Sequence, residues 1–300
     1  MIKEFKNTYI ALGSFDGIHE GHMSLVKKTV KLAKENNGTS IVFTFKNHPR
    51  EILNSKNKIK LLMNNRDKEK ILLENNVDYV YFQEFTKEFM KYSPREFIKY
   101  IKDKFNVKGI VVGFNFKFGY KNLGDVNLLE ELGKEFNYDL YVLPPCLYDE
   151  NPISSTLIRK YLLEGNVEKA TILLGRNYYL EGIVTEGRKI GRTIGFPTAN
   201  LGYNEKALLP KEGVYYTLVL VNNNIYKAIT NIGNNPTVNG KRLTIESYIL
   251  DFDDNIYGEN IKVNFIKRIR DVKKFNSLEE LKHQLEKDKN YAKEEKIIYN

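Results

Sequence analysis

Short apolar runs alternate with amphipathic helical segments over the first 145 residues, and this alternation strongly limits the possible folds. The strand-like and helical segments lie, in chain order, at 8–12, 23–35, 40–45, 66–74, 77–82, 94–104, 109–114, 126–136 and 139–145. Strand, loop, helix and strand in succession form βαβ units with parallel strands. The sequence therefore predicts an open parallel sheet with helices on both faces and ligands at the carboxyl ends of its strands.

The pattern changes beyond about Asn151. Two short helical stretches, 155–163 and 167–174, end at Gly175 and predict a connector. The strand-like runs that follow, separated by glycine and asparagine turns, lie at 179–187, 213–221, 225–233, 244–252 and 260–270. Short strands at this spacing predict a small antiparallel barrel. Ser277, with a glutamate three residues later, has the capping-box spacing and predicts a last helix over 277–288.

Length and composition predict the compartment and the number of domains. With 300 residues, 42% of them hydrophobic, the chain is long enough for two domains. The single cysteine, Cys146, excludes an internal disulfide framework and a cysteine-rich zinc site, and it suits a reducing compartment. The first residues lack a signal-peptide pattern, and no apolar run approaches the roughly 18 residues of a membrane span. We therefore expect a soluble, cytoplasmic protein with no membrane partner.

The charge balance raises nucleic acid as a partner but does not favour it. The chain has 47 basic and 38 acidic residues, a net charge of +9. Its lysines are scattered along helical segments such as 25–37, and no block of five consecutive basic residues occurs, so they indicate solvated helix faces. An anionic small substrate explains the basic balance equally well. The oligomeric state is left open.

GSFDGIHEGH, residues 13–22, falls between the first predicted strand and helix. Its glycines Gly13, Gly17 and Gly21 allow close approach of a ligand to the backbone, and the helix start favours an anion. His19 and His22 can donate hydrogen bonds to phosphate oxygens. From the histidine spacing alone, a helix cap with two surface histidines is equally well supported, whereas a zinc pair lacks a third ligand nearby in sequence.

A second glycine-rich segment, GIVTEGRKIGRTIGFPTANL, spans 182–201. Its glycines and basic residues are Gly182, Gly187, Gly191, Gly195, Arg188, Lys189 and Arg192. Such a segment binds phosphate or forms a mobile hairpin, and the residues alone do not decide between these. Thr198 and Asn200 supply hard oxygen ligands that suit Mg²⁺, or they form an ordinary turn after Pro197.

The motifs resemble those of the bacterial bifunctional riboflavin kinase/FAD synthetases. GSFDGIHEGH is similar to the nucleotidyltransferase motif G-x-F-D-x-x-H-x-G-H, and GRTIGFPTAN is similar to the riboflavin kinase motif. The other matching segments, in the family's order, are FTFKNHP (43–49), GFNFKFG (113–119), ISSTLIR (153–159), GVYYTLV (213–219), TNIGNNPTV (230–238) and the closing helix. The resemblance implies a Rossmann-like nucleotidyltransferase domain over 1–160, a helical connector over 161–178, and a six-stranded antiparallel β-barrel kinase domain with a terminal helix over 179–300.

In the first domain, the resemblance implies that His19 and His22 bind the phosphates of ATP and stabilise the adenylyl-transfer transition state. It assigns further ATP-binding positions to Gly13, Phe15, Asp16, Gly17, Ser154, Ser155, Thr156 and Arg159. Asn115 would contact the nucleotide or the FMN end of the same cleft. In FKNHP, Asn47 replaces a proline that relatives commonly carry, which puts the flexibility of that loop in doubt.

In the second domain, the resemblance assigns ATP binding to Gly187, Gly191, Arg192, Thr198 and Asn200, with Thr198 and Asn200 also on Mg²⁺. It assigns Glu246 as the catalytic base that takes the proton from the riboflavin 5′-hydroxyl. Without the resemblance, Glu246 would be interpreted as a solvent-facing strand residue. NIGNNPT, residues 231–237, resembles a mobile loop of the family.

The sequence therefore predicts an enzyme that phosphorylates riboflavin to FMN and adenylylates FMN to FAD, using ATP and Mg²⁺ in both steps. Two alternatives are a nucleotidyltransferase with another phosphate acceptor and a flavin-sensing RNA-binding regulator. The first has no reason to carry GRTIGFPTAN. The second is disfavoured by the intact Glu246 and the two motif histidines.

Overall fold

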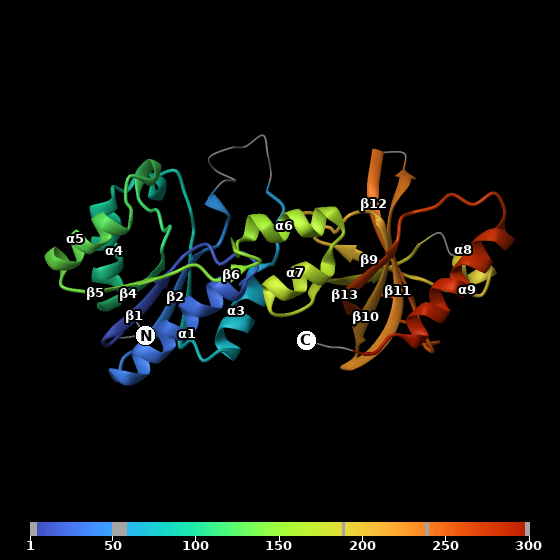
Figure 1. Ribbon diagram of the computed structural model, residues 1–300, viewed down its shortest axis with the longest axis horizontal. Coiled ribbons are helices and arrows are strands. Elements are labelled where there is room, and N and C mark those ends of the chain that lie inside the picture. Colours follow the sequence, from blue (N-terminus) through green and yellow to red (C-terminus); the bar gives the residue numbers. More distant parts are fainter. Residues whose placement is uncertain (1–4, 50–58, 188–189, 238–239, 298–300) are drawn as a thin grey trace. The chain divides into compact units, whose positions relative to one another are not determined.

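The computed structural model describes residues 5–49, 59–187, 190–237 and 240–297, without the side chains of Ile190, Arg192 and residues 235–242. The chain divides into two compact units, Met1–Ser155 and Thr156–Asn300 (Figure 1). No helix within the described ranges is both long and apolar enough to cross a membrane.

The first unit is built on a parallel sheet of five strands in the order β3-β2-β1-β4-β5. The strands are β1 (Thr8–Leu12), β2 (Ser40–Phe45), β3 (Tyr79–Gln83), β4 (Val107–Gly113) and β5 (Asp139–Leu143). All residues of β1 are buried, because it is the central strand and both of its faces are covered. The predicted parallel sheet is confirmed.

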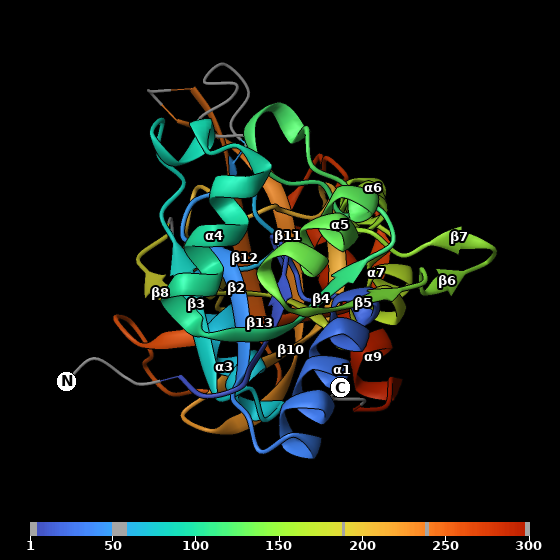
Figure 2. The same cartoon turned by 90° about the vertical axis from the view of Figure 1, so that its left-hand side faces the viewer.

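Helices cover both faces of this sheet, as predicted. The long helices are α1 (Glu20–Glu35), α3 (Asn65–Glu74), α4 (Pro94–Phe105) and α5 (Val126–Phe136), and two short 3₁₀ turns are η1 (Phe89–Lys91) and η2 (Tyr120–Asn122). Apolar residues of α1 and α3 pack with Tyr9 and Ala11 on one face of β1. Those of α4 and α5 pack with Ile10 and Leu12 on the other face, and Figure 2 shows the unit from this side. A short ribbon of β6 (Leu147–Tyr148) and β7 (Asn151–Pro152) projects from the sheet.

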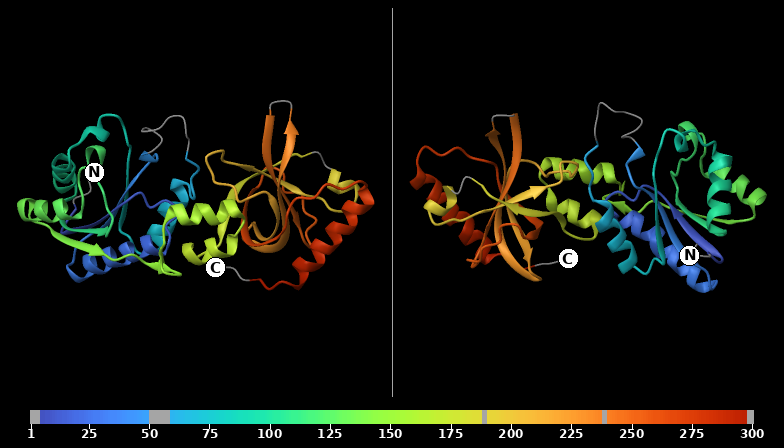
Figure 3. Two further views of the ribbon diagram at one scale, coloured as in Figure 1. Left: turned by 45° about the horizontal axis from the view of Figure 1, so that its top comes forward. Right: turned by 180° about the vertical axis from the view of Figure 1, so that it is seen from behind.

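Helix α6 (Ser155–Glu164) starts at the last residue of the first unit, α7 (Val167–Leu174) follows in the second, and Gly175 ends α7 in a left-handed conformation with φ of 68°. A closed barrel follows, with strand order β10-β11-β12-β9-β8-β13 and antiparallel pairing throughout (Figure 3). The remaining elements are β8 (Tyr178–Thr185), α8 (Ile190–Thr193), β9 (Ala199–Tyr203), β10 (Gly213–Val221), β11 (Asn224–Thr237), β12 (Gly240–Ile249), β13 (Asn260–Arg270) and α9 (Leu278–Glu294). The predicted six-stranded barrel with a terminal helix is confirmed.

Two barrel strands differ from their expected ranges. The strand expected over 225–233 continues to Thr237 through the segment that resembled a loop, because its backbone pairs with β12 in an unbroken register from Ala228↔Ile249 to Thr237↔Gly240. β9 has no counterpart among the strand-like runs of the sequence. It forms through pairing with β8 and β12, which lie far from it in the chain.

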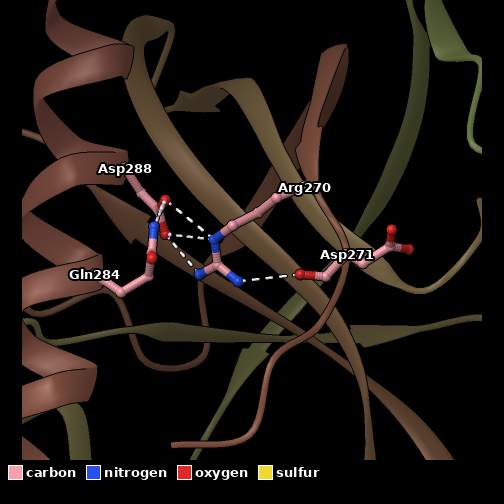
Figure 4. Close-up of polar contacts among 4 residues, drawn as sticks. All are labelled: Arg270, Asp271, Gln284 and Asp288. Carbon is pink, nitrogen blue, oxygen red and sulfur yellow. Dashed lines mark hydrogen bonds and ion pairs between the residues drawn. The ribbon is translucent and has the colours of Figure 1, made fainter.

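An ion pair fixes α9 to the end of β13 (Figure 4). The Arg270 Nη2 and Nε atoms donate to the Asp288 carboxylate, with Nη2–Oδ2 at 2.6 Å. The Gln284 amide also donates to Asp288, over 2.9 Å, and the Asp288 side chain is only 2% exposed. Ser277 caps α9 by accepting from the Glu280 N–H, as predicted, although the Glu280 carboxylate accepts from the N–H of Asn276 rather than of Ser277. The buried Asp288 carboxylate thus accepts from both β13 and its own helix, which ties the two elements together.

Candidate active sites

The loop 13–19 joins β1 to α1 at the carboxyl edge of the parallel sheet. Phe15, Gly17 and Ile18 have positive φ values of 47°, 81° and 39°. A non-glycine residue costs about 1–3 kcal/mol in this region of backbone space, so the surrounding structure must hold the turn. The side chains of Phe15 and Ile18 are fully buried and provide part of that hold.

The two motif histidines stack against each other at the start of α1. His19 is the N-cap residue, and its Nδ1 accepts a hydrogen bond from the His22 N–H over 3.3 Å. The two rings have centroids 3.6 Å apart, and the Phe15 ring lies 5.1 Å from that of His22. The helix therefore begins at Glu20, three residues before the predicted start, because an imidazole here satisfies a free N–H of the first turn.

The capping role agrees with one of the two interpretations of the histidine spacing, but the histidines are not surface residues. His19 is 6% exposed, and His22 is half-buried. Both imidazoles lie where the first-turn N–H groups and the positive end of the helix dipole favour an anion. This arrangement suits binding of phosphate.

The loop is also tied to the ISSTLIR segment. The buried Asp16 accepts from the Leu62 N–H through its carboxylate, over 3.2 Å, and from the Ser155 hydroxyl through its carbonyl, over 2.9 Å. Ser155 is the first residue of α6 and follows the half-buried Ser154. Thr156 and Arg159 belong to the second compact unit, so their place at this site stays a prediction.

Asn115 and Asn47 follow β4 and β2, the two strands that flank β1 in the sheet. Asn115 is exposed, in the turn that follows β4, the strand beside β1. The Asn47 side chain donates to the Phe85 carbonyl and accepts from the Phe85 N–H, over 3.0 and 2.9 Å. This pair of bonds ties the segment after β2 to the segment after β3.

Lys68 is a residue of this site that the sequence interpretation missed. It lies on α3 and is 5% exposed, and its ammonium donates to the Ser14 carbonyl over 2.9 Å and contacts the Thr44 hydroxyl at 3.3 Å. Burial lowers the pKa of Lys68 to about 8, although the nearby Asp16 carboxylate favours the charged form. The available signal was its spacing, since Lys68 shares a helix face with Ile71 and Leu72.

The second site is a row of polar residues on three adjacent barrel strands. Glu246 of β12 pairs in register with Asn200 of β9 and with Asn231 of β11. Their neighbours Ala199, Ile245 and Ser247 are buried in the barrel, so Glu246 lies on the opposite, outer face of β12. Directly opposed residues have Cβ atoms about 5 Å apart, which brings the predicted base beside a predicted metal ligand.

Local contacts fix the direction of these side chains. The Thr244 hydroxyl lies 3.3 Å from the Glu246 Oε1 and 3.4 Å from the Gly233 carbonyl oxygen, and it can donate its proton to either acceptor. A Cβ atom at Gly187 would lie 2.7 Å from the Asn200 Cγ and closer still to its Nδ2, so the glycine is needed for the asparagine to take this position. Gly191 accepts from the Phe196 N–H over 2.8 Å, which closes the turn of the GRTIGF segment. The Arg192 side chain lies outside the described residues.

A cavity of about 240 Å³ opens beside Thr198. Its walls include Val184, Pro197, Ile249 and Ile256, residues 252–255, and also Ala199 and Ser247 from the buried face of β9 and β12. The cavity therefore lies on the face of β12 opposite to Glu246, and Thr198 borders it.

The donors at this site fit Mg²⁺ in a nucleotide complex. Thr198 and Asn200 offer neutral oxygen ligands, the hard type that Mg²⁺ prefers. Across the described part of the chain, no group of three His, Cys, Asp or Glu side chains is placed to hold a metal ion. A divalent ion held by these residues would therefore take much of its shell from phosphate oxygens and water.

Comparison with known proteins identifies the family. Two family models match the chain: FAD synthetase over residues 1–157 and riboflavin kinase over residues 174–296. A bifunctional riboflavin kinase/FMN adenylyltransferase of Bacillus subtilis is 36% identical over 297 residues, which cover 97% of this chain and 94% of the relative. The chain belongs to the bifunctional riboflavin kinase/FMN adenylyltransferase family. It is thus an enzyme of flavin biosynthesis with one region for each activity.

Other relatives agree in sequence and fold. A protein of Escherichia coli K12 with the same description is 34% identical over 287 residues, or 95% of this chain and 91% of the relative. A solved structure described as a macrolide-efflux protein from Streptococcus pneumoniae has a TM-score of 0.91 at 33% identity and covers 98% of this chain and 96% of its own. The region matched as FAD synthetase contains the stacked histidines, and the region matched as riboflavin kinase contains the Asn200–Glu246 pair.

Proposed function

We propose that the chain phosphorylates riboflavin at the outer face of β9 and β12 and adenylylates the resulting FMN at the β1–α1 loop, with ATP and Mg²⁺ at both sites. We assign the first step to residues 179–300, the second to residues 1–160, and the connection to residues 161–178. The observation that carries this proposal is the register of β9 and β12, which sets Glu246 directly opposite Asn200.

In the kinase step, Glu246 accepts the proton of the riboflavin 5′-hydroxyl as this oxygen attacks the γ-phosphorus of ATP, and ADP leaves as its bond to that phosphorus breaks. The Thr244 hydroxyl lies beside this carboxylate, 3.3 Å from Oε1. Thr198 and Asn200 would hold Mg²⁺, which when bound offsets the charge of the phosphates. Gly187, Gly191 and Arg192 are assigned to the ATP phosphates. General base catalysis contributes roughly 10²- to 10⁴-fold, and positioning supplies most of the rest of such a transfer.

In the adenylyl-transfer step, a phosphate oxygen of FMN attacks the α-phosphorus of ATP in line, and pyrophosphate leaves. His19 and His22 donate to the phosphate oxygens as negative charge grows on the leaving group, beside the N–H groups that begin α1. The triphosphate is further assigned to Ser154, Ser155, Thr156 and Arg159, whose hydroxyls and guanidinium suit phosphate. Asn115, at the next strand end, contacts the nucleotide or FMN. No covalent enzyme intermediate is required.

We place the enzyme in the cytoplasm, with riboflavin, FMN and ATP rather than nucleic acid as its partners. The support is chemical. The one cysteine of the chain, Cys146, is free, which suits a reducing compartment. The loop 13–19, with its two histidines at a helix start, suits phosphate binding. The row of polar residues on β9, β11 and β12 suits a nucleotide with a divalent ion.

A paired assay of two variants tests the assignment of the two sites. Each preparation receives riboflavin in one tube and FMN in another, both with ATP and Mg²⁺. His22→Ala should lose FAD formation from FMN and keep the kinase, and Glu246→Gln should do the reverse. Equal loss of both activities in either folded variant would contradict the separate assignment of the two steps.

A further inference from the structure

We propose that Lys68 is a positioning residue of the adenylyl-transfer site, which holds the Ser14 carbonyl and favours anionic phosphates at the loop 13–19 through its buried positive charge. This inference rests on the proposed function of that loop. Lys68 does not touch the reacting atoms, and it acts through the backbone of the turn.

The geometry places Lys68 directly against the strained turn. The Ser14 carbonyl accepts from the Lys68 ammonium over 2.9 Å and from the Thr44 hydroxyl over 2.8 Å. The next residue, Phe15, has a φ of 47°. Because the Ser14 carbonyl belongs to the peptide that enters this residue, the two donors fix the orientation of the turn that leads to His19.

A second contact connects the same part of the chain to the loop. The Leu62 N–H, just before α3, donates to the Asp16 carboxylate over 3.2 Å. The loop is therefore held at Ser14 and at Asp16 by two positions on and just before α3. Of these two contacts, the one made by Lys68 brings a formal positive charge under the loop.

The burial of Lys68 has a cost that packing alone does not explain. Burial lowers the pKa of the ammonium to about 8, so the folded protein disfavours its charged form relative to water. The charged group acting on it is the Asp16 carboxylate from the loop, while β2 contributes the uncharged Thr44 hydroxyl. Methionine would fill a similar space without the cost of burying a charge. The positive charge of Lys68 therefore serves the anionic phosphates that bind at the loop 13–19.

The charge predicts an alkaline decline in ATP use. As the pH rises through about 8, Lys68 loses its proton, the positive charge under the loop disappears, and the free enzyme binds ATP less well. The ratio kcat/KM for ATP reports groups of the free enzyme, so it should show this decline. The phosphates of ATP and FMN do not cause it, since the second pKa of a phosphate ester is about 6.

The experiment measures kcat/KM for ATP in the conversion of FMN to FAD between pH 6.5 and 9.5 for the wild type, Lys68→Met, Lys68→Arg and Lys70→Met. Lys70 lies on the same helix, but its side chain is 72% exposed, so it is the matched control. We expect wild-type kcat/KM to decline above about pH 8, and Lys70→Met to follow it. Lys68→Met should lose about tenfold or more at pH 7.5, the scale of a slightly misplaced site, and show no decline.

Lys68→Arg separates charge from packing, because arginine stays protonated throughout this range. Relative to its own value at pH 7.5, this variant should retain more activity at pH 9.5 than the wild type does. Riboflavin kinase activity of each preparation confirms that the chain is folded. If Lys68→Met does not fold, the profiles of the wild type and Lys68→Arg decide the question.

Three results would overturn the proposal: a wild-type profile without a decline near pH 8, a decline that persists in Lys68→Arg, or Lys68→Met activity within twofold of the wild type. His22→Ala, measured in parallel, distinguishes this failure from failure of the proposed site. If His22→Ala also keeps full FAD formation, the loop itself has been assigned wrongly. If only the Lys68 variants behave as the wild type, the site stands and Lys68 has no part in it.

Discussion

Gly187→Ala should lower the activity of the kinase by displacing the Asn200 side chain. The added Cβ would lie 2.7 Å from the Asn200 Cγ and closer still to its Nδ2, whereas an ordinary contact starts at 3.4 Å, so the amide must move by roughly 1 Å or more. Productive geometry at such sites tolerates about 0.5 Å, and a shift near 1 Å costs up to about 10²-fold in rate. We therefore expect kcat/KM for FMN formation to decrease by roughly 10- to 100-fold, with a higher Mg²⁺ requirement.

The fold should tolerate this change. Gly187 is not among the residues with positive φ, and the atom that must yield is the end of a side chain rather than backbone. We expect the free energy of unfolding to change by less than about 1 kcal/mol and the conversion of supplied FMN to FAD to stay at the wild-type level. Thermal unfolding and the FMN assay on the same preparation check both points.

A double-mutant cycle tests whether the effect passes through Asn200. Asn200→Ala alone should raise the Mg²⁺ and ATP requirements of the kinase. In that background, Gly187→Ala has no amide left to displace, so the double variant should match Asn200→Ala. Effects of the two substitutions that simply multiply would refute the reasoning, because they would show that Gly187 acts without Asn200.

Three further substitutions, the last with a control at Glu295, have distinct expected outcomes. His22→Ala should reduce FAD formation by roughly 10²-fold or more, the scale of one lost transition-state donor, with kinase activity near wild type; an unchanged rate of FAD formation would remove His22 from the site. Glu246→Gln should lower kcat for FMN formation more than KM, because the amide keeps the size of the side chain but cannot accept the proton; kinase activity within about threefold of wild type would mean that Glu246 is not the base. Asp288→Ala should destabilise the barrel unit by about 3 kcal/mol, because it leaves the Arg270 charge without its buried partner, and should lower its melting temperature by roughly 6–12 °C. Glu295→Ala, which breaks the more exposed pair with Lys267, should cost less than about 1 kcal/mol, and equal effects of the two substitutions would contradict this account of the ion pairs.

Local patterns in the sequence predicted most elements of both units. The turn between β10 and β11 is a clear case, because Asn222 and Asn223 both have positive φ, the conformation that a two-residue hairpin needs and that asparagine tolerates. Ser277 caps α9 as its spacing predicted. These features depend on neighbours in the chain, so the sequence alone contains the necessary information.

What the sequence missed depends on partners far along the chain. β9 is a strand only because β8 and β12 supply its hydrogen bonds, and no apolar alternation marks it. Lys68 is an ordinary helical lysine until α3 packs its side chain against Ser14 and Thr44. The partnership of Glu246 with Asn200 likewise required the register of two strands. The residue types at the sites were recognisable from motifs, whereas their mutual placement required the fold.

Incubation of the wild-type chain with riboflavin, ATP and Mg²⁺, followed by chromatographic separation of riboflavin, FMN and FAD over time, tests the two-step account most directly. The account predicts that FMN appears first and FAD follows, with both reactions dependent on ATP. It also predicts that FMN supplied in place of riboflavin gives FAD without a lag. Accumulation of FMN with no FAD, from riboflavin and from supplied FMN alike, would contradict the adenylyl-transfer half, and unchanged riboflavin would contradict the kinase half.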